Sequence, residues 1–162
     1  MSPIVKRSQK VSFVETTPAG AYARMKGFTA LSHAKNPKEY TRQYVDEDGE
    51  TTDVVGFSPS MEFALDQLLA DASQKPFIDI IDGELTGDAA KVNIITVDLS
   101  GTAPFKAVKR QYLVVPGTEG DGAEAYTYGG TLKAVPGTKV VGTATSTDEF
   151  KANATFVPPV AG

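Results

Sequence analysis

The chain has 162 residues and a mass of 17.1 kDa, with 16 basic and 20 acidic side chains and a net charge of −4. This length suits one domain with its own core, and 41% hydrophobic with 22% charged residues fits neither a disordered chain nor a membrane protein. The absence of cysteine excludes disulfide scaffolds, thiol catalysis and cysteine-bound zinc. Because no apolar run approaches the roughly 20 residues that cross a bilayer, neither a membrane anchor nor a secretory signal is expected.

The charge is distributed unevenly along the chain. Residues 1–44 carry a net charge of +6, residues 45–100 carry −11 and residues 101–162 carry +1. Such asymmetry within one domain indicates either two oppositely charged solvated faces or two surfaces that contact partners.

The first predicted elements alternate between irregular and strand-like segments. Residues 1–20 have no steady period and are interpreted as an extended N-terminal arm rather than a core element. Residues 22–32 are typical of a strand with a bulge at Gly27. Residues 33–37 predict a turn, because the residue before Pro37 is disfavoured in the helical region.

The next segment predicts a β-hairpin. Tyr40, Arg42 and Tyr44 alternate with polar residues over 39–45, and a second strand-like run follows at 51–55. Between them lies an acidic turn with an Asp-Gly pair, which is a strong hairpin signal. The residues of this tip are Asp46, Glu47, Asp48, Gly49 and Glu50.

A half-buried strand and a short helix are predicted next. Met61, Phe63 and Leu65 alternate with an outer face that carries Glu62 and Asp66. Residues 75–83 then place apolar side chains at helical spacing, between a proline suited to the first turn and a glycine that ends the helix. The helix is too short to persist without packing against a sheet.

The rest of the chain predicts further strands near residues 92–99, 105–115, 126–135, 138–145 and 149–156. Seven to nine strands with one short helix indicate a mainly β fold, either a β-sandwich or a partly open barrel. We expect a single domain over residues 21–157, preceded by the arm at 1–20 and followed by an extended tail at 158–162.

No residue pattern predicts catalysis. His33 is the only histidine and falls in the predicted turn, and the sequence contains no nucleophile elbow, phosphate-binding loop or dinucleotide fingerprint. Glu119, Asp121 and Glu124 fit a solvated loop better than an ion site. The acidic chain, with a pI of about 5.0, is poorly suited to bind nucleic acid. We expect no enzyme activity, no metal and no cofactor.

Four segments resemble the major tail tube proteins of long-tailed bacteriophages. They are residues 36–47, 51–60, 77–86 with 92–99, and 129–144, so the resemblance extends over most of residues 22–157. Its most specific part is the run Val-Val-Gly-Phe-Ser-Pro-Ser at 54–60, directly after the acidic hairpin. The other segments are generic β sequence.

The resemblance implies a structural subunit of the virion tail, assembled in the host bacterial cytoplasm. Such subunits form hexameric rings that stack head-to-tail into a hollow conduit for DNA ejection, with a hairpin that contacts the next ring. The implied partners are further copies of the chain and the tape-measure, tail-terminator and distal tail proteins, while DNA passes through the lumen without specific binding.

Three groups of residues are assigned from this interpretation. The tip Asp46–Glu50 is the candidate ring-stacking contact. The candidate lumen-facing residues are Glu62 and Asp66, with Thr41 and Gln43 beside them. The candidate basic surface that receives the tip on a neighbour comprises Lys6, Arg7, Lys10, Arg24 and Lys26.

Another class of protein remains open on sequence alone. An immunoglobulin-like virion decoration domain, or a carbohydrate-binding or adhesion module, would have a similar strand pattern. A monomeric binder has no need of a long charged hairpin and extended arms, so these features favour the tube subunit.

Overall fold

A computed structural model of the chain describes residues 3–16, 20–120 and 122–159. Within these ranges the structure has eleven strands, one α-helix and two short 3-10 helices, η1 (Arg7–Gln9) and η2 (Gly87–Ala90). Nine strands form one sheet, and the remaining two form a separate hairpin. The prediction of a mainly β fold with one short helix is confirmed, with more strands than the predicted seven to nine.

Six strands of the large sheet close into a barrel. The barrel closes because β10 pairs with β11 on one side and with β8 on the other. In order around the barrel, the strands are β10 (Val140–Thr145), β11 (Asn153–Val157), β2 (Ala21–Arg24), β1 (Lys10–Thr16), β7 (Lys91–Asp98) and β8 (Phe105–Glu119). Phe13, Ile95, Val97, Ala107 and Phe150 belong to the hydrophobic cluster formed by these strands.

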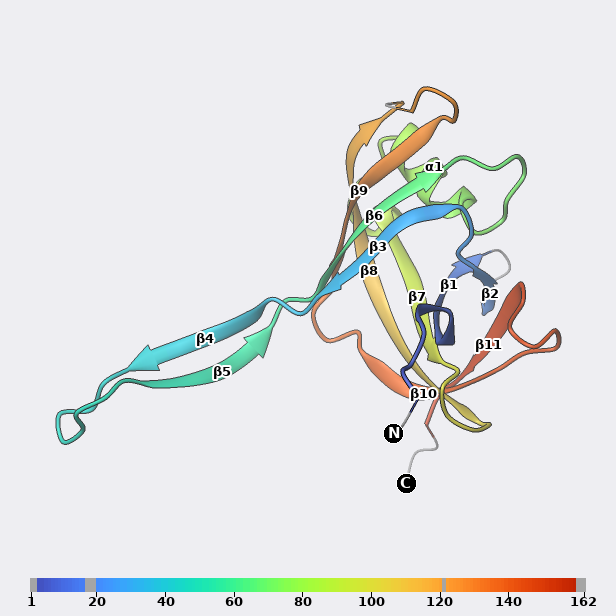
Figure 1. The fold of residues 1–162 in the computed structure, drawn as a ribbon. Coiled ribbons are helices and arrows are strands. Elements are labelled where there is room, and N and C mark those ends of the chain that lie inside the picture. Colours follow the sequence, from blue (N-terminus) through green and yellow to red (C-terminus); the bar gives the residue numbers. More distant parts are fainter. Residues whose placement is uncertain (1–2, 17–19, 121, 160–162) are drawn as a thin grey trace.

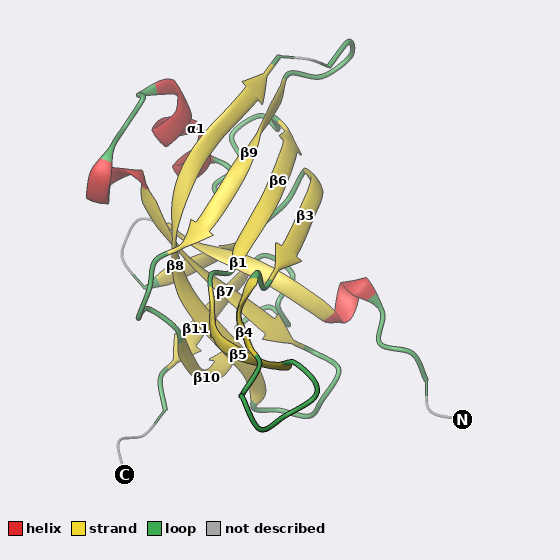
Figure 2. Cartoon of the chain, turned by 90° about the vertical axis from the view of Figure 1, so that its left-hand side faces the viewer, coloured by secondary structure: helices red, strands yellow, loops and turns green. Residues whose placement is uncertain are grey.

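The sheet continues beyond the barrel as a four-stranded extension. Strand β8 is long enough to pair along its second half with β9 (Thr127–Ala134), which is followed by β6 (Ser60–Asp66) and β3 (Phe28–Ala34). Figure 2 shows these strands side by side above the barrel. A second hydrophobic cluster joins this extension to β7 and to helix α1 (Lys75–Asp82).

The predicted helix is present and packs as its spacing implies. Phe77, Ile80 and Ile81 are buried, with the Phe77 ring 5.5 Å from that of Phe28 and 5.6 Å from that of Phe63, centroid to centroid. Burial of this apolar face, rather than intrinsic helix propensity, stabilises so short a helix.

The predicted arm is wrong for residues 10–16, which form the core strand β1. This strand pairs with β2 and β7, and its adjacent residues Phe13 and Val14 are both fully buried. Phe13 belongs to the barrel cluster and Val14 to the second cluster, so β1 lies between two cores. A strand buried on both faces has no alternating pattern. Residues 3–9 remain exposed or partly exposed at the periphery, and residues 1–2 and 17–19 lie outside the described ranges.

Three strand boundaries also differ from the prediction. The expected strand at 22–32 is two strands, because Gly27, with φ of +76°, separates β2 from β3. The expected turn at 33–37 is confined to Lys35 and Asn36. The last strand begins only at Asn153, because Glu149 and Phe150 have φ of +60° and +63° and cannot belong to a strand. Of the expected tail, residues 160–162 lie outside the described ranges.

Candidate assembly surfaces

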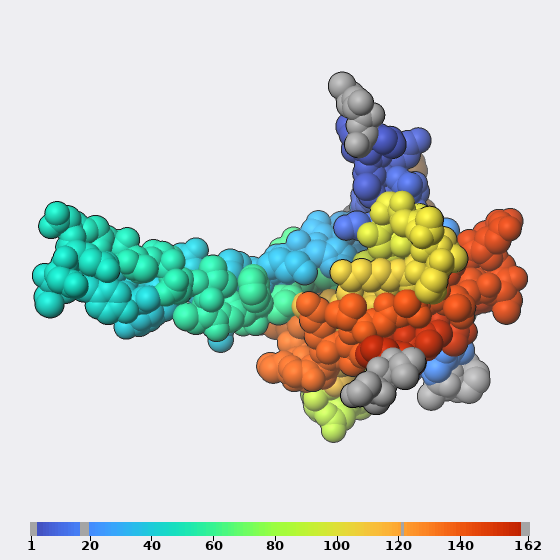
Figure 3. Space-filling view, turned by 90° about the horizontal axis from the view of Figure 1, so that it is seen from below, coloured from blue at the N-terminus to red at the C-terminus, as the bar shows by residue number. Residues whose placement is uncertain are grey.

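The predicted hairpin is present and projects from the body of the molecule. Strands β4 (Pro37–Arg42) and β5 (Thr51–Phe57) pair with each other and with no other described strand. Figures 1 and 3 show a narrow arm that extends away from the barrel. An isolated two-stranded hairpin is marginally stable in water, so this arm must rely on contacts within itself or with another molecule.

Arg42 supplies the internal contacts of the hairpin. Its guanidinium carbon lies 4.9 Å from the ring centroid of Tyr40 and 5.2 Å from that of Tyr44, in the geometry of a cation–π contact on each. The same group donates hydrogen bonds to the Tyr44 hydroxyl and, across the strands, to the Asp53 carboxylate. Arg42 therefore connects the two strands near the tip.

The hairpin tip presents acidic groups to solvent. Glu47 accepts a hydrogen bond from Thr51 Oγ1 at 3.2 Å, which orders the loop. Asp46, Asp48 and Glu50 are exposed and form no ion pair with any residue that the structure describes. The apolar side chain of Val45, next to these acids, is fully exposed.

Apolar side chains continue along the arm. Tyr40, Val54, Val55 and Phe57 are all more than half exposed, with Phe57 at 61% and Val55 at 64%. Apolar side chains concentrated on one projecting element mark an interaction surface rather than a solvated loop.

Four of the five predicted basic residues line one groove. It has a volume of about 1190 Å³ and is bordered by η1, β1, β2, β3, β6, β7 and β8. Lys6, Arg7, Lys10 and Arg24 line it, whereas Lys26 does not. We call this feature the basic groove.

The structure adds four cations to the basic groove that sequence reasoning missed. They are Lys35, Lys106, Arg110 and Lys139. Lys106 and Arg110 lie on one face of β8 together with Val108, so alternation could have revealed them. Their proximity to the N-terminal segment depends on a long-range pairing that no local pattern shows.

The groove has one carboxylate among its described lining residues, that of Asp98, which lies opposite Lys10 in the β1–β7 pairing. The side-chain and backbone hydrogen bonds from Ser100, with the positive charges of Lys10 and Lys106, lower the pKa of Asp98. His33 also lines the groove. Desolvation, together with the charges of Lys35 and Arg110, lowers its pKa below the ordinary value of 6.5.

Glu62 and Asp66 lie on the face of the four-stranded extension that is turned away from helix α1, which we call the open face. Their neighbours Met61, Phe63 and Leu65 point into the second cluster, as the alternation predicts. Across the strands, the partners of Glu62, Ala64 and Asp66 on this open face are small or hydroxylated: Ser32 and Thr131 beside Glu62, Ala30 and Gly129 beside Ala64, and Thr127 beside Asp66. Lys133 lies on the same face, opposite Ser60.

The prediction that Thr41 and Gln43 lie beside Glu62 and Asp66 is wrong. Both residues belong to the projecting hairpin, which is not part of the large sheet. Thr41 Oγ1 is 3.1 Å from Thr52 Oγ1 across the hairpin, and Gln43 donates a hydrogen bond to the Glu47 carbonyl. The sequence could not show this separation, because it depends on where β4 and β5 leave the sheet.

The described residues contain no group of three or more histidine and acidic side chains arranged to hold a metal ion. Glu119 accepts a hydrogen bond from the Tyr126 hydroxyl at 2.9 Å, while Asp121 lies outside the described ranges. Helices of membrane-spanning length and hydropathy are likewise absent from the described part of the chain.

Comparison with solved structures identifies the fold. The subunit of the SPP1 tail tube, determined by solid-state NMR and cryo-electron microscopy, matches with a TM-score of 0.71 at 12% identity. The match covers 91% of this chain and 84% of that one. The chain has the fold of a tail tube subunit. This is the fold that the sequence resemblance implies.

A second match has a similar fold at lower similarity. A chain of the anti-feeding prophage baseplate, determined by cryo-electron microscopy with sixfold symmetry, matches with a TM-score of 0.50 at 11% identity. The match covers 87% of this chain and 96% of that chain. No family model matches the sequence, and no curated protein matches it.

Proposed function

We propose that this protein is a structural subunit of a bacteriophage tail tube. In this proposal it assembles into hexameric rings that stack into the conduit for DNA ejection. The observation that carries the proposal is the shared fold with the SPP1 tail tube subunit over 91% of the chain. The sixfold symmetry of the anti-feeding prophage baseplate supports six subunits per ring.

The free sheet edge supports lateral assembly. Strand β3 ends the large sheet and pairs only with β6 among the described strands. An uncovered edge strand presents unpaired backbone groups that a strand of another chain can pair with. In a ring, each subunit covers the free edge of its neighbour, which leaves no open edge.

The open face of the four-stranded extension is the proposed wall of the conduit. Most of its side chains are small or hydroxylated and offer no stacking platform for bases. The carboxylates of Glu62 and Asp66 repel phosphates and outnumber Lys133, the cation beside Ser60 on this face. Both properties suit a surface that DNA passes without adsorbing. The subunit performs no catalysis in this role and acts in the virion tail.

The projecting hairpin is the proposed contact between rings. Stacking head-to-tail is heterologous and requires two different complementary surfaces on each subunit. We assign the acidic tip to one of these surfaces. The tape-measure, tail-terminator and distal tail proteins are the proposed partners at the two ends and in the lumen of the tube.

Negative-stain electron microscopy of the purified protein over a range of concentrations tests the proposal. We expect rings or tubes at high concentration, and loss of tubes when Asp46, Glu47 and Asp48 are changed to lysine. A matched control changes Glu84, Glu124 and Glu149 to lysine, three exposed acids that form no ion pair with any described residue, and should still form tubes. A protein that stays monomeric at every concentration would instead favour an adhesion or decoration module.

A further inference from the structure

We propose that the basic groove is the receptor for the acidic hairpin tip of a second copy of the chain, so that Lys35, Lys106, Arg110 and Lys139 form the stacking contact together with the N-terminal cations. This inference rests on the proposed self-assembly and specifies where on the neighbour the tip is received. It moves the centre of the predicted basic surface from the N-terminal segment to a groove shared with β3, β7 and β8.

Charge is the first argument for this pairing. The groove gathers eight basic side chains around one carboxylate, and none of them forms an ion pair with another described residue. The tip presents four carboxylates that are equally free of ion pairs within the described chain. Complementary potentials of this kind favour association and fix its orientation.

The apolar character of both surfaces is the second argument. Met25, Phe28 and Leu31 line the groove beside its cations, as do Val108 and Tyr112 of β8. The tip carries the fully exposed Val45 next to its acids and the half-exposed Tyr44. An acidic peptide turn with an apolar residue satisfies both parts of the groove, whereas a sugar–phosphate backbone would leave the apolar part without a partner.

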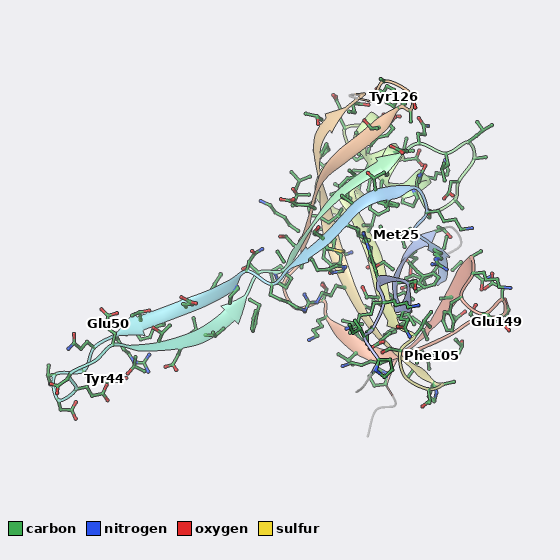
Figure 4. The ribbon with its side chains drawn as sticks, in the orientation of Figure 1. Met25, Tyr44, Glu50, Phe105, Tyr126 and Glu149 are labelled. Carbon is green, nitrogen blue, oxygen red and sulfur yellow. The ribbon has the colours of Figure 1, made fainter. Side chains whose placement is uncertain are left out.

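The position of the hairpin prevents its tip from reaching the basic groove of the same chain. Tyr44 and Glu50 lie at the far end of the arm, while Met25, in the groove, lies in the body (Figure 4). Strands β4 and β5 hold the tip away from the body, as Figure 1 also shows. The occupant must therefore come from another copy, and a tip that enters a distinct groove makes a head-to-tail contact that propagates without closing.

Disulfide trapping tests this contact on a clean background, because the chain has no cysteine. Val45→Cys is combined in turn with Lys35→Cys, Lys106→Cys and Lys139→Cys, which leaves all tip acids in place. Val45→Cys combined with Lys133→Cys, on the open sheet face, is the matched control. After mild oxidation, we expect at least one groove pair to give a ladder of covalent multimers on a denaturing gel, and the control pair to stay monomeric.

The form of the product decides between arrangements. A ladder supports a heterologous contact, while dimers alone, a cross-linked monomer, or equal linking of the control would overturn the assignment. Tubes that form without any ladder would refute the docking site and leave the proposed function intact. A ladder without tubes or rings under the microscope would support the docking site and count against the proposed function.

Charge exchange provides a second measurement. Lys106→Glu with Lys139→Glu should raise the concentration at which self-association begins by at least about tenfold. Adding Asp46→Lys and Glu47→Lys to that variant should restore association. If restoration fails and the wild-type groove instead binds duplex DNA in a manner that these glutamates abolish, the groove is a nucleic-acid site and the proposal is wrong.

Discussion

Gly27 lies directly against the side-chain amide of Gln74: a Cβ atom at residue 27 would come within 2.4 Å of Gln74 Nε2. That amide is almost fully buried. It donates to the carbonyls of Lys26 and Asp66 and accepts from the backbone N–H of Leu68. Gln74 thus connects the break between β2 and β3 to the end of β6 and the loop before α1.

Gly27→Ala should therefore destabilise the fold strongly. Residue 27 has φ of +76°, which costs an alanine about 1–2 kcal/mol, and displacing Gln74 leaves buried polar groups without partners, at about 1–3 kcal/mol more. We expect a total loss of about 2–5 kcal/mol in the free energy of unfolding, measured by urea denaturation.

Gly137→Ala is the matched control, because Gly137 has φ of +77° and no atom within 4 Å of the added Cβ. Its cost should be limited to the backbone term of about 1–2 kcal/mol. Equal losses of unfolding free energy in the two variants would show that the Gln74 side chain can move aside at no energetic cost.

Arg42→Lys should loosen the hairpin without affecting the body. Lysine keeps the charge but lacks the planar group that contacts both Tyr40 and Tyr44. We expect the free energy of local opening to fall by about 1 kcal/mol, seen as faster amide hydrogen exchange in β4 and β5. The free energy of global unfolding should change by less than about 0.5 kcal/mol, as for ordinary surface substitutions.

Glu39→Gln, on the opposite face of β4, serves as the control for Arg42. It should leave hairpin exchange unchanged. Unaltered exchange in Arg42→Lys would contradict the role assigned to the guanidinium.

Local pattern predicted the elements whose packing is one-sided. The hairpin, strand β6 and helix α1 each bury one face or none, so alternation, turn chemistry and helical spacing were sufficient. Strand β1 was missed because Phe13 and Val14 are buried in different cores, which removes the period of two. Strand β7 buries Ile94 and Ile95 in the same way, but its many β-branched residues still predicted a strand.

The candidate surfaces were predictable only in part, because they depend on tertiary placement. The acidic tip is contiguous in sequence and was assigned correctly to a hairpin turn. The cations of the basic groove come from η1, β1, β2 and β8 and from the segments beside these and other elements, and only the structure places Lys139 and Lys6 in one groove. Likewise, the hairpin leaves the sheet after Ala34, which separates Thr41 from Glu62.

His33 should titrate below its ordinary pKa in the unassembled protein. Desolvation, with the charges of Lys35 and Arg110, disfavours its protonated form. Because the folded pKa lies below the unfolded value of 6.5, the folded state binds fewer protons near that pH. The contribution of His33 to the free energy of unfolding is therefore fully present above pH 6.5. It is lost as the pH falls through 6.5 toward the folded pKa.

NMR titration of the only histidine measures this directly. Lys35→Met should raise the pKa of His33 by removing a nearby charge, and His33→Gln should remove its share of the pH dependence of unfolding. A pKa at or above 6.5 in the monomer would mean that Lys35 and Arg110 do not act on the imidazole in solution.

The open face of the four-stranded extension should become inaccessible from outside when tubes form. Glu62 is exposed in the free subunit, and the chain has no cysteine, so Glu62→Cys introduces a single thiol. A maleimide on a large polyethylene glycol should label this thiol in free subunits and fail to label it in assembled tubes, while a small maleimide should label it in both states.

Lys75→Cys on helix α1, where the native side chain is 75% exposed, should react with the large reagent in both states. This control separates exclusion by a lumen from general loss of access, because α1 covers the opposite face of the extension. Full labelling of Glu62→Cys in intact tubes would place the open face on the outside and remove Glu62 and Asp66 from the conduit wall.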